Sequence, residues 1–212
     1  MFGLSASSII SRVITLVIAL SFHEFAHAWS ANAFGDDTPR LYGRLTLNPL
    51  AHLDPIGSLM LVVAGFGWAK PVPVNMYNLQ RRSSSAPMWV AAAGPLSNLL
   101  LALLAAIPLR LGLVPFTFSS GLLPSMYSFL VTFIQINLLL MIFNLIPVSP
   151  LDGEKVAQYI LPRSWVDFLD RIRPYGPIIL MALLFVLPTI GIDIIGWIIR
   201  PVFNLFWNLL VA

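Results

Sequence analysis

The sequence predicts an all-α polytopic membrane protein, and three observations support that prediction. Hydrophobic residues make up 58% of the 212 residues, whereas charged residues make up only 10%. The mean hydropathy is +0.86, well above that of ordinary soluble domains. The apolar residues are also gathered into long segments, and most of the polar residues lie in the connections between them.

About four segments are long enough to cross the roughly 30 Å hydrocarbon core as helices. They are residues 4–34, 88–113, 122–148 and 177–199. The first resembles a secretory signal peptide, because an A-x-A triplet follows its apolar stretch. The residues before Arg12 carry no other positive side chain, however, so we expect a permanent span.

Two further apolar segments are too short to span alone. Residues 56–68 contain three glycines and predict a re-entrant or half-span element, whose backbone must be covered by protein or by a water-filled cavity. Residues 201–212 either prolong the fourth helix or lie in the membrane interface.

The sequence contains no repeat and no polar region large enough for a separate soluble domain. We therefore expect a single membrane-embedded domain over residues 1–212. Its core is predicted at about residues 4–161 and a C-terminal helical segment at about residues 175–212.

Positive charges occur in two of the three connections between the predicted spans. They are Arg40, Arg44, Lys70, Arg81 and Arg82 in the first, and Lys155, Arg163, Arg171 and Arg173 in the third. The second connection, residues 112–121, has no charge, so the positive-inside rule places the other two in the cytoplasm and the N-terminus outside. The net charge of +3 does not indicate nucleic-acid binding, because the basic residues are spread among loops.

The most informative motif is His23-Glu24-Phe25-Ala26-His27, an H-E-x-x-H pentad at the end of the first apolar stretch. In a helix, His23 and His27 lie one turn apart on one face and can bind a single metal ion. Glu24 then lies beside the ion, where it can act as a general base in hydrolysis. The alternative is that these are ordinary core histidines, but ionisable residues in a span are costly and usually functional.

The composition limits the ligands that can complete this site. The chain has no cysteine, so a thiolate ligand is excluded and the third ligand must be His, Asp or Glu. Its three histidines are too few for a multi-histidine di-iron site. We expect one zinc ion, held by three protein ligands with a fourth position open.

Asp152 is the candidate third ligand. It follows Pro147 and Pro150, which break the third span, and it precedes Gly153, which permits a tight turn. The predicted topology places it at the same membrane depth as the pentad. Alternatively, Asp152 caps a helix over residues 153–161, and the two roles are compatible.

Three motifs together resemble the site-2 protease family of intramembrane zinc metalloproteases, over about residues 21–161. They are the pentad, the A-A-G-P-L-S-N run at residues 92–98 and the N-x-x-P-x-x-P-L-D-G run at residues 144–153. The resemblance implies that His23, His27 and Asp152 bind zinc and that Glu24 is the general base. Ser149 stands where many members have proline.

The resemblance also implies that Asn98 positions substrate or stabilises the oxyanion. The alternative is that Asn98 joins helices by hydrogen bonding, while Gly94 allows their close packing. Asn137 and Asn144 have the same two interpretations, and a structural role is favoured for Asn137.

The loop after the first span also resembles compact members of the family, which have no PDZ or nucleotide-sensing domain. His52 and Asp54 rank below Asp152 as ligands, because nearby prolines indicate a constrained loop with local hydrogen bonds. The resemblance implies short β-strands at residues 40–47 and 71–75, near the cytoplasmic membrane surface. Such strands hold an unwound substrate by strand addition.

These features predict an intramembrane zinc metalloendopeptidase in a prokaryotic cell membrane, with its active site toward the cytoplasmic side. Its expected substrates are single-span membrane proteins, cleaved in or near the transmembrane segment as in regulated intramembrane proteolysis. One alternative is a non-proteolytic scaffold or chaperone that retains the protease fold. A transporter is a third interpretation, but the spans contain few other buried charges for an ion path.

Overall fold

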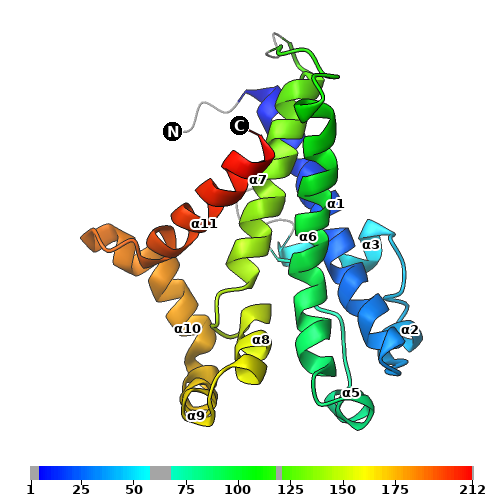
Figure 1. Ribbon diagram of the computed structural model, residues 1–212, viewed down its shortest axis with the longest axis vertical. Coiled ribbons are helices and arrows are strands. Elements are labelled where there is room, and N and C mark those ends of the chain that lie inside the picture. Colours follow the sequence, from blue (N-terminus) through cyan, green and yellow to red (C-terminus); the bar gives the residue numbers. More distant parts are fainter. Residues whose placement is uncertain (1–4, 58–67, 118–120, 212) are drawn as a thin grey trace.

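The computed structural model describes residues 5–57, 68–117 and 121–211, and its ordered elements are helical (Figure 1). The longer helices are α1 (Ala6–Ala33), α6 (Ala86–Arg110), α7 (Met126–Asn144) and α11 (Ile194–Leu210). The shorter ones are α2 (Thr38–Leu41), α3 (Pro49–His52), α5 (Met76–Arg82), α8 (Asp152–Ile160), α9 (Arg163–Ile172) and α10 (Gly176–Met181). The short turns η1 (Arg173–Tyr175) and η2 (Ala182–Val186) flank α10, and η3 (Leu187–Ile190) follows η2.

The first three predicted spans are confirmed as long apolar helices. α1, α6 and α7 are each long and apolar enough to cross a membrane, judged by length and composition. They pack against one another side by side, and α6 also contacts α8 (Figure 1). We call α1, α6 and α7 the bundle. It has the architecture expected of a polytopic membrane protein.

Small side chains let the helices of the bundle approach closely. The buried face of α1 repeats every fourth residue, and its members are Ser7, Ser11, Thr15, Ala19, His23 and His27. The facing side of α6 is also rich in small buried residues, including Ala91, Gly94, Ala102, Ala105 and Ala106. Small residues at helix interfaces bring backbones together in membranes, where packing rather than water exclusion drives association. The two histidines therefore lie on the tightly packed face.

The largest apolar core lies between α6, α7 and α11. α7 contributes buried Ile134 and Leu138, and Leu210 near the end of α11 is buried in the same cluster. Residues 201–210 thus belong to α11 and pack against the bundle. They continue the helix that begins at Ile194 and that already contains the last residues of the predicted fourth span, 194–199, whereas the rest of that predicted span lies in other elements.

The predicted fourth span, residues 177–199, has the wrong bounds. The fourth apolar helical run extends instead over Arg163–Ile190. It ends at Gly191, whose φ of 83° lies in the left-handed region that glycine adopts without strain. Asp193 then caps α11 by accepting a hydrogen bond from the Gly196 N–H at 2.8 Å. We call Arg163–Ile190 the arm.

The predicted short β-strands are wrong within the described residues, which contain no strand at 40–47 or 71–75. α2 begins with Thr38-Pro39 and covers the start of the first range. In the second range, Pro71 and Pro73 lack the N–H groups that a strand ladder requires. Leu53 and Ala69 form a single antiparallel bridge. The half-span predicted at 56–68 falls mostly on residues 58–67, which lie outside the described part of the chain.

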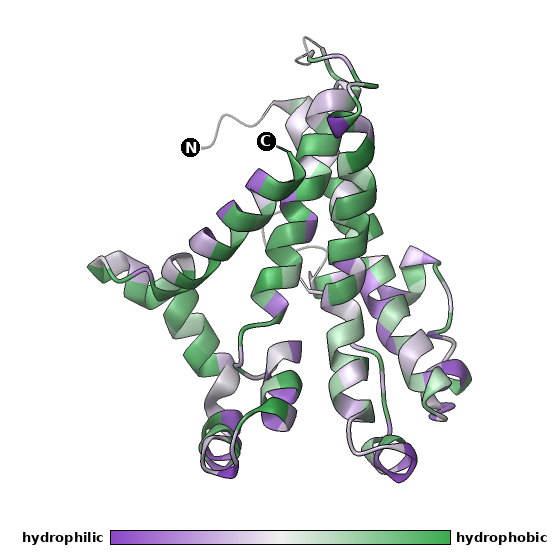
Figure 2. Cartoon of the chain, in the orientation of Figure 1, coloured by the Kyte–Doolittle hydropathy of each residue, from purple (hydrophilic) through white to green (hydrophobic). Residues whose placement is uncertain are grey.

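The two connections with positive charges lie at the same end of the molecule. α5, α8 and α9 lie at the end opposite to the connection that joins α6 to α7, and the start of α1 and the end of α11 lie toward that connection (Figure 1). Figure 2 shows hydrophilic residues gathered on α2, α5 and α9, while the middle of the bundle is mostly hydrophobic.

Candidate metal centre

Three side chains from distant parts of the chain converge inside the molecule. The Nε2 atoms of His23 and His27 lie 3.0 Å apart. Each of them lies 3.2 Å from Oδ2 of Asp152. Among the described residues, these three form the cluster of His, Asp or Glu side chains suited to a metal ion. Both histidines are buried.

The local structure explains how each side chain reaches the cluster. His23 and His27 are four residues apart in the continuous helix α1, so their rings lie on one face. Asp152 is the first residue of α8, and Leu151 rather than Asp152 occupies the N-cap position. A Cβ at Gly153 would collide with the backbone carbonyl of Leu145, so only glycine lets α8 begin this close to the end of α7. The break after α7 therefore turns the Asp152 carboxylate toward α1.

The donor set fits a zinc ion. Tetrahedral zinc with ligands at about 2.0–2.1 Å places its ligand atoms about 3.3–3.4 Å apart. The observed edges of 3.0–3.2 Å are close to that spacing. Two imidazoles and one carboxylate also leave one position of a four-coordinate site for water or substrate.

Gly94 of α6 forms the opposite wall of this centre. A Cβ at Gly94 would lie 2.6 Å from His23 Nε2 and would also collide with His27 Nε2. Any larger side chain would enter the space that faces both ligand atoms. The absence of a side chain here keeps that space open between α1 and α6.

The hydrogen bonds on the far side of the rings determine which nitrogen faces the cluster. His27 Nδ1 lies 2.7 Å from the Val90 carbonyl oxygen, which only accepts hydrogen bonds, so Nδ1 carries the proton. His23 Nδ1 lies 2.7 Å from Asn98 Oδ1 and donates to it in the same way. In the neutral tautomers both Nε2 lone pairs then point at the cluster, as metal ligation requires.

Asn98 lies behind His23 rather than on the open side of the cluster. The side chain is fully buried. Its Oδ1 accepts from His23, and its Nδ2 donates to the Ala19 carbonyl at 3.2 Å and to Asn137 Oδ1 at 3.0 Å. Both amide hydrogens are therefore in use, and neither remains for the oxyanion role that the sequence resemblance implied.

Glu24 is close to the cluster but is not one of the three clustered residues. It is buried, with 9% of its surface exposed, and it follows His23 directly in α1. No hydrogen bond or ion pair of its carboxylate occurs within the described part of the chain. The residue is thus separate from the ligand set.

The other sequence candidates make local contacts. His52 is buried and its Nε2 donates to the Thr46 carbonyl, while Asp54 Oδ1 accepts from the Gly57 N–H. Asn144 donates to the Leu140 carbonyl one turn earlier in α7. None of the three belongs to the cluster around Asp152.

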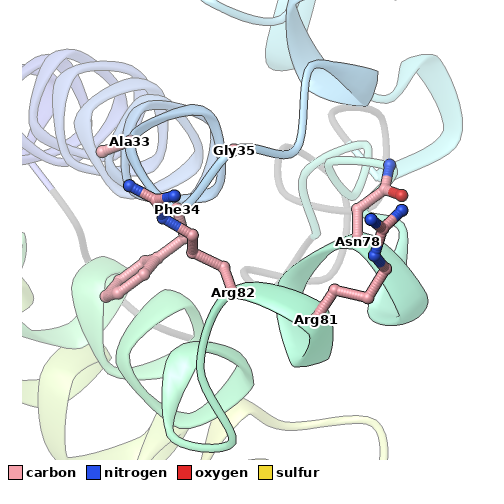
Figure 3. A pocket seen from close by; sticks show the side chains of 6 residues that line it. All are labelled: Ala33, Phe34, Gly35, Asn78, Arg81 and Arg82. Atoms are coloured by element: carbon pink, nitrogen blue, oxygen red, sulfur yellow. The ribbon is translucent and has the colours of Figure 1, made fainter.

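A hollow of about 340 Å³ lies away from the cluster, between the C-terminal end of α1 and α5 (Figure 3). Its lining residues are Ala33, Phe34, Gly35, Asn78, Arg81 and Arg82. In this view the Arg81 side chain points toward Asn78, and the Arg82 side chain points toward Ala33. The hollow contains none of the clustered metal-ligand residues.

Comparison with known proteins identifies the family. The chain is 42% identical over 181 residues to "Putative zinc metalloprotease YwhC" of Bacillus subtilis (strain 168), which covers 83% of this chain and 80% of the relative. It is 31% identical over 193 residues to "Putative zinc metalloprotease Rip2" of Mycobacterium tuberculosis (strain ATCC 25618 / H37Rv), covering 90% of this chain and 70% of the relative. The chain belongs to the site-2 protease family. No family model and no solved structure matches it.

This membership confirms the family that the three sequence motifs predicted. Two features of the centre went unnoticed in the sequence, namely the Val90 carbonyl behind His27 and the direction of the Asn98 amide. Pro95 does not point to Val90, because the carbonyl that its missing N–H leaves unbonded lies four residues earlier, at Ala91. Neither feature therefore has a signal in the local sequence.

Proposed function

We propose that the chain is an intramembrane zinc metalloendopeptidase, which hydrolyses peptide bonds in or near transmembrane segments of single-span membrane proteins. The observation that supports this most strongly is the convergence of His23, His27 and Asp152 between apolar helices. The relatives carry the words zinc metalloprotease in their names. We assign the two histidines and Asp152 as the ligands of one zinc ion.

In this proposal the ion and the protein have separate tasks. Zinc, when bound, supplies a Lewis acid for hydrolysis. Glu24 accepts a proton from the attacking water and later donates it to the leaving amine. The carboxylate suits that task because it lies beside the ligands in α1 without being one of them.

The substrate class follows from the surroundings of the site. The two histidines lie on α1, whose exposed residues include Ile9, Val13 and Phe22, so a substrate reaches them most readily from the lipid. A peptide bond within a transmembrane helix is hydrogen-bonded and shielded, and its cleavage requires local unwinding. Residues that destabilise a helix near the cleaved bond should therefore favour cleavage.

We further propose that the α5–α8–α9 end faces the cytoplasm of a prokaryotic cell. The positive residues of the first and third connections occur toward that end, opposite to the uncharged connection between α6 and α7. Asp152 begins α8 on this side of the break after α7. Cleavage would then occur toward the cytoplasmic side of the substrate helix.

The Glu24→Gln variant tests the proposed chemistry. It keeps the shape of the side chain but removes the base, so we expect zinc content to stay at one ion and cleavage to fall by about 10²–10⁴-fold. Zinc is measured by elemental analysis of the purified protein, and cleavage by mass spectrometry of single-span segments in lipid vesicles. Asp167→Asn, an equivalent change at an exposed carboxylate in α9, serves as the matched control and should retain both.

Two outcomes would contradict the proposal. Unchanged cleavage by Glu24→Gln would remove the general base from the mechanism. Bound zinc without cleavage of any segment by the wild-type protein would favour the alternative of a scaffold or chaperone that retains the protease fold.

A further inference from the structure

We propose that Asn98 and Asn137 form an amide relay that positions His23 for zinc, by fixing the proton on Nδ1 and the lone pair on Nε2. The inference rests on the proposed zinc site, though not on proteolysis itself. Asn98 and Asn137 are positioning residues here, since each acts on the metal through His23.

The direction of the relay follows from its starting point in α7. Asn137 Nδ2 donates to the Phe133 carbonyl at 2.9 Å, which leaves Asn137 Oδ1 as the atom facing Asn98. Because that oxygen only accepts, Asn98 must present Nδ2 to it. Asn98 Oδ1 then faces His23 Nδ1, which must donate.

A second acceptor fixes the same orientation independently. Asn98 Nδ2 also donates to the Ala19 carbonyl of α1. Rotating the amide by 180° would place Oδ1 against the oxygens of Ala19 and Asn137. It would also place Nδ2 against His23 Nδ1, which would move the imidazole proton to Nε2 and remove the lone pair needed by zinc.

Burial gives these hydrogen bonds their importance. Asn98 and Asn137 are both 0% exposed, so water does not replace a missing partner. The relay also joins all three helices of the bundle, from Asn137 in α7 through Asn98 in α6 to His23 in α1. The orientation of one ligand thus depends on the packing of the whole bundle.

The two histidines are held in different ways. His27 donates to a backbone carbonyl, that of Val90, whereas His23 depends on a side chain. Substitution of Asn98 should therefore affect His23 while leaving the His27 hydrogen bond in place. Substituting the hydrogen-bond partner of a metal-binding histidine typically lowers metal affinity by about 10–100-fold.

The test measures binding of zinc alone, by competition with a chromophoric chelator, using full-length protein in detergent. Asn98→Leu removes the acceptor and should weaken zinc binding by about 10–100-fold. Asn98→Asp keeps an oxygen toward His23 Nδ1, a common partner of a zinc-bound histidine, but sets its second oxygen against the Ala19 and Asn137 oxygens, so it should restore only part of that loss. Asn137→Leu breaks the relay without contacting a ligand and should cause a smaller loss.

Thr132→Val is the matched control in α7. Like Asn137, Thr132 donates to a carbonyl four residues earlier, but it belongs to no chain of bonds that reaches His23. This variant should bind zinc as the wild type does. The visible absorption of Co²⁺ in place of zinc provides a second readout, because it reports ligand geometry and should change in Asn98→Leu and not in Thr132→Val.

The outcomes separate this inference from the proposed function. Failure of the wild-type protein to bind zinc would overturn both. Normal zinc binding and an unchanged Co²⁺ spectrum in folded Asn98→Leu would overturn the relay alone. A ranking of wild type, Asn98→Asp and Asn98→Leu in falling affinity would support it.

Discussion

The bundle helices and the arm each contain an apolar stretch long enough to cross a membrane, but these stretches differ in how much of their surface the rest of the protein covers. In the most apolar stretch of each bundle helix, about a third of the residues are buried. The buried shares are 33% in α1, 39% in α6 and 33% in α7. The corresponding share for the arm, Arg163–Ile190, is 6%. Hydropathy alone does not separate the two regions, because their most apolar stretches are similarly hydrophobic. The buried share does distinguish the bundle from the arm. The histidines of the metal centre lie in the bundle, on the face of α1 that packs against α6.

The largest effect is expected from filling the wall of the centre. Gly94→Val would place side-chain atoms against the Nε2 atoms of His23 and His27. Zinc affinity should therefore fall further than it does when a hydrogen-bond partner of a ligand is substituted, a change that typically costs about 10–100-fold. Gly121→Val is the control, because a Cβ there meets nothing within 4 Å. Zinc content and cleavage are the measurements. Retention of zinc in Gly94→Val would mean that the two helices separate easily, contrary to the tight packing inferred for the bundle.

The second prediction compares packing in the bundle and in the arm directly. Ile134 in α7 is 0% exposed, whereas Ile178 in α10 is 69% exposed. Ile134→Ala leaves a cavity and should lower the free energy of unfolding by about 2–5 kcal/mol. Ile178→Ala should change it by no more than about 0.5 kcal/mol. Reversible unfolding in mixed detergent micelles measures both values, and equal losses would remove the distinction between the two regions.

The smallest effect concerns the turn that follows α1. Burial tends to raise the pKa of Asp36, but hydrogen bonds from Thr38, Asn75 and Asn78 outweigh it and hold the pKa below its ordinary value of 3.8. A lowered pKa stabilises the fold above pH 3.8, and this contribution is lost as the pH falls through the folded-state value. Asp36→Asn should therefore cost about 1–3 kcal/mol at neutral pH.

Thermal unfolding at several pH values tests this prediction. The difference between wild type and Asp36→Asn should shrink as the pH drops below 3.8. A difference that stays constant down to pH 2 would show that the Asp36 charge does not stabilise the turn.

The comparison also explains which features were predictable from the sequence. His23 and His27 were predictable because a spacing of four on a long helix determines their common face. Asp152 was predictable because prolines and a glycine mark the break that carries it. In both cases the relevant information is local in the sequence.

The features that were missed depend on backbone direction or on distant partners. Hydropathy averages composition and does not detect that the helical run ends at Gly191, although Gly191 followed by Asp193 is a recognisable end and start of helices. The orientation of Asn98 depends on Asn137 and Ala19, which lie on two other helices. No pattern near residue 98 contains that information.

The position of Asp152 late in the chain has a consequence for biogenesis. A nascent chain that has left the ribosome only as far as α7 carries both imidazoles but not the carboxylate. The centre is therefore incomplete during most of synthesis, and it closes only when α8 emerges and packs against α6. The host membrane is thus not exposed to a competent hydrolase until insertion of the bundle is finished.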